Sequence, residues 1–308
     1  MEKRQHLYNA LDYHLKEKYG KKVFKIALNG DFTCPNRDGR VGYGGCIFCS
    51  AEGSGDFAGP RSEPLKTQFA KIKGIMEQKW PDGLYIVYFQ ANSNTYGPLA
   101  KLKALFEEAI SLDSNIVALS IATRCDCLEP EVLDYLEDLN ERIPVWVELG
   151  LQTSHPETMK FLNLGYDTET FKKAVFELRK RNIETIAHII NGLPGETKEM
   201  MLDTVRFLNN LPVNGIKIHS LFLMKNTVLG KMYLENPFPL LTLEEYADIV
   251  SEQLALLRED IVVHRVSGDA PREELIEPRW SLKKLVVMNE IDKRMRKLGY
   301  FQGCKHQK

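Results

Sequence analysis

Residues 23–50, VFKIALNGDFTCPNRDGRVGYGGCIFCS, join an apolar run to a turn-rich loop that holds three cysteines. The run VFKIALN is nearly continuous in hydrophobicity, which is typical of a parallel strand buried on both faces. Similar runs recur along the chain and predict a parallel sheet of six strands. The five later runs are LYIVYFQ (84–90), NIVALSIATR (115–124), VWVELGLQT (145–153), TIAHIING (185–192) and GIKIHSLFLM (215–224).

Segments with a 3.6-residue apolar period lie between these runs, most clearly at 98–112, 129–142, 168–182 and 195–210. From the second run onward the strand centres are spaced by roughly 30 residues, the length of one βα unit. This pattern predicts an α/β fold, either a βα barrel or an open doubly wound sheet. Even strand lengths, and the lack of a G-x-G-x-x-G turn after the first strand, favour a partial (β/α)6 TIM-like barrel with a small C-terminal α/β extension.

Three parts of the chain are predicted: an N-terminal helix over 1–22, the barrel over 23–231 and the extension over 232–308. The stretch 265–308 holds 11 Lys and Arg against 6 Asp and Glu, although the whole chain has a formal charge of −1. Two interpretations stay open: an RNA-facing patch with a tryptophan as stacking platform, or a solvated helix face. The residues concerned are Arg265, Arg272, Arg279, Trp280, Lys283 and Lys284.

The composition, 44% hydrophobic and 27% charged, is that of an ordinary globular protein. The first 22 residues are too polar for a secretory signal, and no apolar run approaches the ~20 residues that span a bilayer. We therefore expect a cytoplasmic protein that does not bind membranes. In that compartment thiols stay reduced, and clustered cysteines more often bind metal or react than form disulfides.

The cysteine loop contains an unusual number of thiols for a closed metal site. Cys46 and Cys49 form C-I-F-C, and 11 residues separate Cys34 from Cys46. A structural zinc site normally has four Cys or His ligands, and a second CxxC pair is absent. A dithiol redox pair would leave Cys34 unexplained. Iron–sulfur clusters normally have four thiolates, so three would leave one iron open for a substrate or cofactor.

A three-cysteine loop that follows the first strand of a βα barrel and ends in cysteine-x-aromatic-cysteine resembles the radical S-adenosylmethionine (SAM) superfamily. The resemblance implies that Cys34, Cys46 and Cys49 hold a [4Fe–4S] cluster whose open iron binds SAM. The cluster then transfers an electron that cleaves SAM to a 5′-deoxyadenosyl radical. A reductase with flavodoxin, or a ferredoxin, is the implied electron donor. The commonest spacing in the superfamily is C-x3-C-x2-C, and the longer first gap here is similar to the branch of the Elongator catalytic subunit.

Further motifs over about residues 20–230 carry the same resemblance. ELGLQT (148–153) is similar to a fourth-strand motif whose glutamine contacts SAM, which implies this role for Gln152. A basic residue eight positions later in relatives corresponds to Lys160. IAHIINGLPGET (186–197) resembles the fifth-strand signature and places His188 at a polar position that faces the cofactor.

The remaining cofactor contacts are also implied by position. Phe48 matches the aromatic residue that flanks the adenine. Asn92 and Thr123 follow strands two and three, where the amino acid and ribose of the cofactor would lie. For Cys125 and Cys127, two interpretations stay open: reduced, partly buried thiols, or a hydrogen-donor or second-metal role.

The stretches IKIHSLFLMKNT (216–227) and EPRWSLKK (277–284) resemble a bacterial subfamily of unassigned radical SAM enzymes related to Elongator. The resemblance implies a tRNA-modifying oxidoreductase or transferase that acts on the wobble uridine or its partly built side chain. Two alternatives stay open. One is oxidation of a small molecule, as in coproporphyrinogen dehydrogenase-like enzymes, and the other is a non-catalytic iron–sulfur or zinc module that binds RNA.

Overall fold

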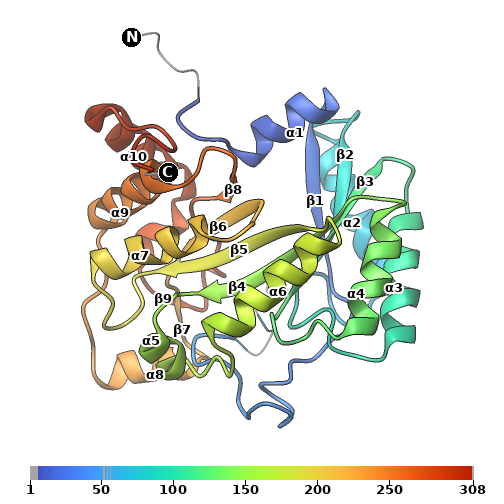
Figure 1. The fold of residues 1–308 in the computed structure, drawn as a ribbon, viewed down its shortest axis with the longest axis horizontal. Helices are drawn as coiled ribbons and strands as arrows, with labels where there is room; N and C mark the ends of the chain where they lie inside the picture. Colours follow the sequence, from blue (N-terminus) through green and yellow to red (C-terminus); the bar gives the residue numbers. More distant parts are fainter. Residues whose placement is uncertain (1–5, 51–52, 54, 56, 307–308) are drawn as a thin grey trace.

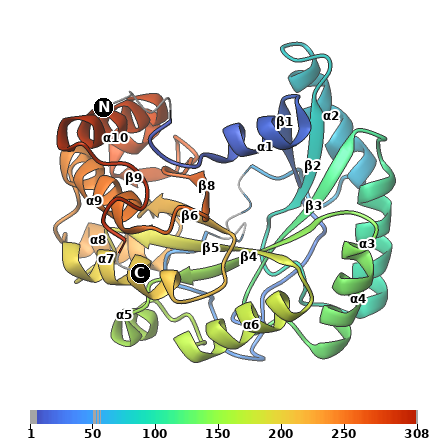
Figure 2. The same ribbon diagram turned by 45° about the horizontal axis from the view of Figure 1, so that its top comes forward.

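The structure is a computed structural model that describes residues 6–50, 53, 55 and 57–306. Within these residues, seven parallel strands form one curved sheet in the order of the chain (Figures 1 and 2). They confirm the six predicted strands, and a seventh, which the apolar run IVVHRVSGD (261–269) of the C-terminal extension also predicts, lies beside β6. The strands are β1 (Val23–Leu28), β2 (Leu84–Phe89), β3 (Ile116–Thr123), β4 (Val145–Gln152), β5 (Glu184–Asn191), β6 (Gly215–Ser220) and β8 (Val262–Arg265).

Five helices cover the outer face of the sheet between successive strands (Figure 2). Their apolar stripes pack on the strands and form the main core, with Phe89, Phe106 and Phe171 fully buried in it. Side-chain caps begin two of them, because Asp167 and Thr197 accept hydrogen bonds from backbone N–H groups of the first turn. The helices are α2 (Leu65–Glu77), α3 (Leu99–Ser111), α4 (Pro130–Asn140), α6 (Thr168–Lys180) and α7 (Lys198–Asn209).

The sheet is open between β1 and β8, which makes the fold the expected partial barrel. Helix α1 (Leu11–Tyr19) lies in this gap (Figure 2). Ala10 forms a bridge with Val263, and Leu15 packs with Val23 and Trp146 at the amino ends of the strands. Helix α1 therefore closes one end of the half-barrel and leaves the carboxyl ends of the strands accessible.

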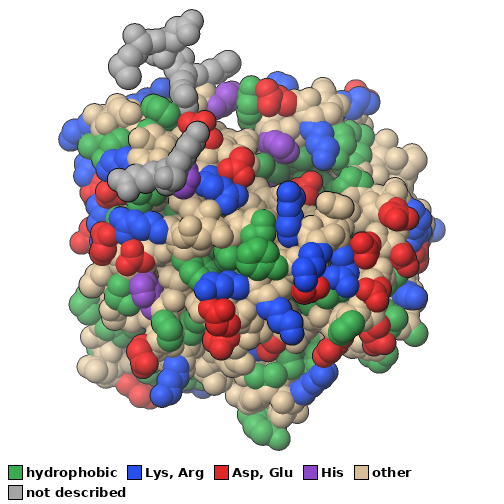
Figure 3. Space-filling view, viewed as in Figure 1, with side chains coloured by type: hydrophobic (Ala, Val, Ile, Leu, Met, Phe, Trp, Pro, Cys, Tyr) green, Lys and Arg blue, Asp and Glu red, His purple; other side chains and the backbone are tan. Residues whose placement is uncertain are grey.

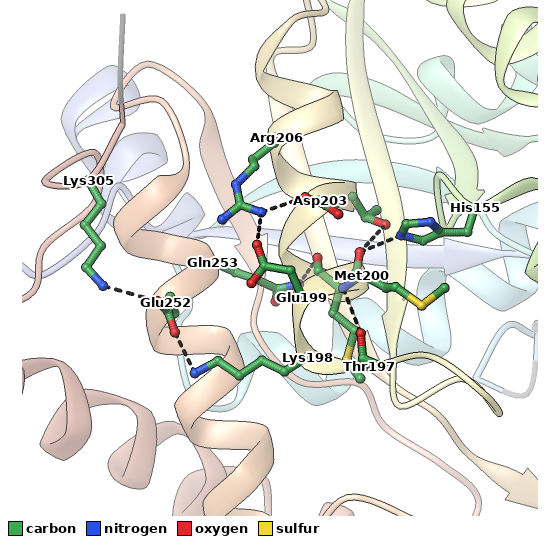
Figure 4. A network of polar contacts seen from close by, with 12 residues as sticks. His155, Thr197, Lys198, Glu199, Met200, Asp203, Arg206, Glu252, Gln253 and Lys305 are labelled. Atoms are coloured by element: carbon green, nitrogen blue, oxygen red, sulfur yellow. Dashed lines mark hydrogen bonds and ion pairs between the residues drawn. The ribbon is translucent and has the colours of Figure 1, made fainter.

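The C-terminal part packs on the barrel through α9 (Leu243–Leu256), which contacts α7 and α10 (Lys284–Leu298). Figure 4 shows the contacts between α7 and α9, where Glu252 pairs with Lys198 at 2.6 Å and with Lys305 at 3.2 Å. The Gln253 amide donates to the Met201 carbonyl oxygen at 2.9 Å. These bonds hold α9 against α7 and Lys305 against α9. The three-part division by residues 1–22, 23–231 and 232–308 stays a prediction.

The last predicted run, 215–224, contains two strands rather than one. After β6 the chain turns, and β7 (Leu223–Met224) pairs antiparallel with β9 (Leu275–Glu277) in a separate ribbon. Short helices α5 (Pro156–Phe161) and α8 (Val228–Glu235) lie near the same end, and η1 (Arg279–Leu282) precedes α10. Of the helices in the described residues, none has the length and apolarity to cross a bilayer.

Two layers of side chains fill the inner face of the sheet. Near the amino ends the inward residues are apolar and include Val23, Ile86, Ala118, Trp146 and Ile186. Side chains alternate between the two faces of a strand, so the residue two positions further along each strand also points inward. At this second level the inward residues are polar. These polar residues are Lys25, Tyr88, Ser120, Glu148, His188 and Lys217, and they form the floor of the site.

Candidate active site

A cavity of about 280 Å³ lies inside the half-barrel and opens at the carboxyl ends of the strands. This is the end at which barrel enzymes place their chemistry. All three cysteines of the loop line it, together with five of the six residues that the sequence assigns to the cofactor. Those five are Phe48, Asn92, Thr123, Gln152 and His188.

Lys160 is the predicted cofactor contact that does not line the cavity. It lies exposed near the end of α5, a helix of six residues whose buried side chains are Thr158 and Met159. In this conformation the side chain points to solvent, so its predicted cofactor role has no geometric support and stays a prediction.

Cys34, Cys46 and Cys49 are half-buried thiols held by a loop with internal turns. Within the loop, the N–H of Arg37 donates to the Cys34 carbonyl oxygen at 2.9 Å, and that of Cys49 donates to the Cys46 carbonyl oxygen at 3.0 Å. Gly44 and Gly45 have φ values of 79° and 80°, a region that favours glycine. The loop is thus folded around its sulfur atoms by its own backbone.

The donor groups around the sulfurs fit a cluster of iron and sulfide. The Asn36 amide donates to Cys46 Sγ at 3.6 Å, and the Arg37 guanidinium donates to Cys49 Sγ at 3.3 Å. Burial raises the pKa of the Cys46 thiol to about 12, and the neighbouring Cys49 and Cys34 thiols add to this shift. A bound iron centre would lower the pKa of Cys46 again and so offset both burial and the neighbouring thiols, because a thiol that coordinates a metal is deprotonated.

The described residues contain no group of three His, Cys, Asp or Glu side chains spaced to hold a single metal ion. A four-iron cluster requires wider spacing of the sulfurs, because each cysteine binds a different iron. Three cysteines around one cavity therefore suit the cluster better than a zinc ion.

The ELGLQT motif has a geometric explanation in β4. The register with β5 shifts between Gly150 and Gln152, and Gln152 has a φ of 67°. Its side chain folds back over Gly150, where a Cβ atom would lie 2.4 Å from Gln152 Nε2. The Tyr166 hydroxyl donates to the Gly150 carbonyl oxygen at 2.7 Å. The glycine thus makes room for the glutamine side chain at the cavity wall.

Asn92 and Thr123 also lie at strand ends with defined partners. Asn92 has a φ of 61°, and its amide donates to the Phe32 carbonyl oxygen at 3.1 Å. The Thr123 hydroxyl lies 2.6 Å from that of Thr95. Both residues are ordered by the protein itself and present their remaining polar surface to the cavity.

Cys125 and Cys127 are buried and are not among the residues that line this cavity. Burial, and secondarily the charge of Asp126, raise the pKa of both thiols well above the usual range. The geometry favours the interpretation of two protonated thiols over the hydrogen-donor role.

The stretch Asn163 to Tyr166 supports the cysteine loop. Asn163 donates to the Gly45 carbonyl oxygen at 2.9 Å, and Asn36 donates to the Asn163 carbonyl oxygen at 2.6 Å. The Arg124 guanidinium lies 4.8 Å from the centre of the Tyr166 ring and donates to the Leu164 carbonyl oxygen. These bonds join the loop after α5 to the cysteine loop.

Sequence reasoning missed the charged network on the cavity floor, which is centred on Glu148. This carboxylate is fully buried, lies 2.5 Å from Lys25 Nζ and 2.8 Å from His188 Nε2, and pairs with Lys217. The Ser120 hydroxyl donates to it at 2.7 Å. Burial acts against the charge, but Lys217 and Lys25 outweigh it and hold the pKa of Glu148 well below its usual range.

A usable signal for this network was present in the sequence. Lys25, Glu148 and Lys217 are single charged residues inside otherwise apolar strands. Each lies at a position that points to the inner face of the sheet. A charge inside a buried strand needs a partner, so these residues indicate that a buried ion pair is present. Which residues pair depends on the order of the strands.

The structure gives no geometric support to Trp280 as an exposed stacking platform, and this interpretation stays a prediction. Its ring is half-buried against Tyr246, with 5.0 Å between ring centres, and its indole N–H donates to the Leu241 carbonyl oxygen at 2.9 Å. Arg265 lines the cavity, whereas Arg272, Arg279 and Lys283 are exposed. On the face in Figure 3, basic and acidic side chains are interspersed.

Comparison with known proteins identifies the family. The Radical SAM superfamily matches residues 35–208, and the Radical_SAM C-terminal domain matches residues 213–297. The chain belongs to the radical SAM superfamily. Radical SAM proteins use a [4Fe–4S] cluster and SAM, which confirms the predicted cofactors.

Relatives of this radical SAM protein include the uncharacterized protein YtqA of Bacillus subtilis, 48% identical over 96% of this chain and 92% of YtqA. A tRNA uridine(34) acetyltransferase of Methanocaldococcus jannaschii is 27% identical over 62% of this chain and 35% of that protein. Among solved structures, Elp3 of Methanocaldococcus infernus has a TM-score of 0.67 at 18% identity, covering 91% of this chain and 64% of that one. The likeness to Elp3 confirms the fold.

Proposed function

We propose that this radical SAM enzyme matures the side chain of the wobble uridine in tRNA, with Cys34, Cys46 and Cys49 as the cluster ligands. One observation carries the proposal: the three cysteine thiols line the same cavity as Gln152 and His188, at the carboxyl ends of the strands. The similarity to part of a tRNA uridine(34) acetyltransferase supports the substrate class.

When bound, the cluster and SAM supply an electron and a reactive carbon radical that removes a hydrogen atom from substrate. The residues of this chain bind, orient and shield. Asn36 and Arg37 donate to the cysteine sulfurs, and Gln152 and Asn92 present amide groups at the cavity wall. Phe48 and Tyr166 contribute aromatic surface that restricts water around the reacting atoms.

The exposed residues Arg272, Arg279 and Lys283 are the proposed contacts to tRNA phosphates. They follow Asp269, Ala270 and Pro271, which line the cavity. A flavodoxin with its reductase, or a ferredoxin, is the proposed electron donor.

The test is the nucleoside profile of tRNA from a strain that lacks this protein. We expect one modified wobble uridine to disappear and its precursor to accumulate, with recovery when the intact gene is restored. An unchanged profile would overturn the tRNA proposal. In parallel, anaerobically reconstituted protein with dithionite and SAM should release 5′-deoxyadenosine. A zinc-loaded protein without this activity would support the non-catalytic alternative.

A further inference from the structure

We propose that the floor of the cavity binds an anionic substituent of the substrate, of carboxylate type, through Lys217, His219 and Arg265. The inference rests on the proposed function, because it names a chemical feature of the substrate at the same site. The three side chains come from adjacent strands β6 and β8, and all of them line the cavity. Lys217 and Arg265 are paired in the register of these strands.

The charges on the floor are unbalanced in favour of cations. Glu148 pairs with both Lys25 and Lys217. Arg265 has Asp269 at 3.4 Å, but Asp269 is closer to Lys284, at 2.9 Å. On the floor, Lys25, Lys217 and Arg265 therefore share one buried carboxylate, Glu148, because Asp269 is exposed and also pairs with Lys284. A bound anion would improve this balance because buried charges are normally paired.

Within the described residues, His219 provides a ring nitrogen without a hydrogen-bond partner beside Lys217. Its Nε2 is buried, and among the described residues it has no hydrogen-bond partner. The ring lies beside that of His188, with 5.3 Å between ring centres, two residues beyond Lys217 on the same side of β6. His219 lines the cavity, and a buried ring nitrogen without a partner at such a site calls for an explanation, which a ligand bonded to it would give.

The electrostatics of Lys217 agree with this geometry. Burial lowers its pKa, and Lys25 and Arg265 lower it further, so that it falls to about 7 in spite of Glu148. Lys25 and Arg265 therefore act on Lys217 as like charges, and Glu148 opposes them. Glu148 explains the position of Lys25 and Lys217, but it does not explain His219 or Arg265, which contact neither of its oxygens in the bonds described above.

The depth of the cluster favours a substituent on the base over a backbone phosphate. Lys217 lies in the middle of β6, below the strand ends near which Asn92 and Gln152 lie. A side chain on an extruded uridine can reach this depth, whereas the phosphates stay at the mouth.

The first test is the chemical nature of the accumulated precursor. In tRNA of the deletion strain, digested to nucleosides and dephosphorylated, we expect the precursor to carry an acidic group, measured by mass and by retention on an anion exchanger. A neutral precursor would overturn this inference and leave the proposed function intact. No accumulated nucleoside would overturn the proposed function itself.

The second test uses the reconstituted enzyme with tRNA from the deletion strain. Arg265→Gln and Lys217→Met should each raise KM for this tRNA by about 10-fold, or 1.4 kcal/mol, since each removes a charge-assisted hydrogen bond. Acetate should inhibit the intact enzyme competitively against tRNA and inhibit Arg265→Gln much less. Matched controls are Arg179→Gln and Lys173→Met, both exposed on α6.

If Lys217→Met fails to fold, judged by circular dichroism, His219→Ala and Arg265→Gln keep the test valid because neither residue pairs with Glu148. An unchanged KM in both variants, or equal acetate inhibition of the intact enzyme and Arg265→Gln, would overturn the inference.

Discussion

His188 Nε2 lies 2.8 Å from Glu148 Oε2 inside the half-barrel, across the boundary between β4 and β5. Burial and the charge of Lys217 lower the pKa of His188 to about 4, and the bond to Glu148 only partly offsets them. The imidazole is therefore neutral at pH 7, and its protonation on acidification opposes the folded state.

The sign of the resulting pH dependence follows from this pKa. The unfolded state has the ordinary histidine pKa of about 6.5 and binds a proton before the folded state does, so stability falls as the pH drops from about 6.5 to 4. We expect the intact protein to lose about 2 kcal/mol more stability than His188→Gln between pH 7 and pH 5. Urea unfolding at both pH values measures this difference. Equal losses in the two proteins would contradict the depressed pKa.

Replacement of a cysteine in the loop should remove the cluster and keep the fold. We expect Cys46→Ser to bind far less than the about four irons of the reconstituted protein and to release no 5′-deoxyadenosine. The matched control is Cys304→Ser, an exposed cysteine in the C-terminal part of the chain, which should match the intact protein. Full iron content in Cys46→Ser would refute the ligand assignment.

A methyl group on Gly150 should displace the Gln152 side chain, because its Cβ atom would lie 2.4 Å from Gln152 Nε2. We expect Gly150→Ala to weaken SAM binding by about 10-fold, or 1.4 kcal/mol, measured by calorimetry on the reconstituted enzyme. Gln152→Ala should lose a similar amount, and the double variant should lose little more, since both act through one side chain.

Gly74→Ala is the control for the previous variant. Gly74 is exposed in α2, and no atom lies within 4 Å of the added Cβ position. This change should leave SAM affinity unchanged and stabilise the helix by about 0.5–1 kcal/mol. Additive losses for the Gly150 and Gln152 changes would mean that they act separately.

Charge reversal of the exposed basic residues should weaken tRNA binding in a salt-dependent way. We expect Arg279→Glu with Lys283→Glu to lower affinity at least 10-fold, and to reduce the slope of log K against log salt by about 1 for each lost phosphate contact. Filter binding at several salt concentrations measures both quantities. Arg179→Glu with Lys173→Glu on α6 is the control, and an equal loss there would mean that only the overall charge matters.

Local patterns in the sequence determined the strands, the main helices and the three-cysteine loop. Runs such as VFKIALN have a hydrophobicity that suits only a strand buried on both faces, and the loop cysteines are neighbours along the chain. The cofactor-contact motifs could also be placed, because each follows a strand and parallel strands end at the same edge.

Only the tertiary structure decided how the charged residues combine. Lys25 and Lys217 lie 123 and 69 residues from Glu148, and their meeting depends on the curvature of a sheet that brings β1, β4 and β6 around one space. The same is true of Lys160 and Trp280, whose exposure depends on which face of a short helix packs on its neighbours. A periodic pattern of apolar residues indicates which positions are buried. The partner of a buried charge depends on strand order and register, which local sequence does not encode.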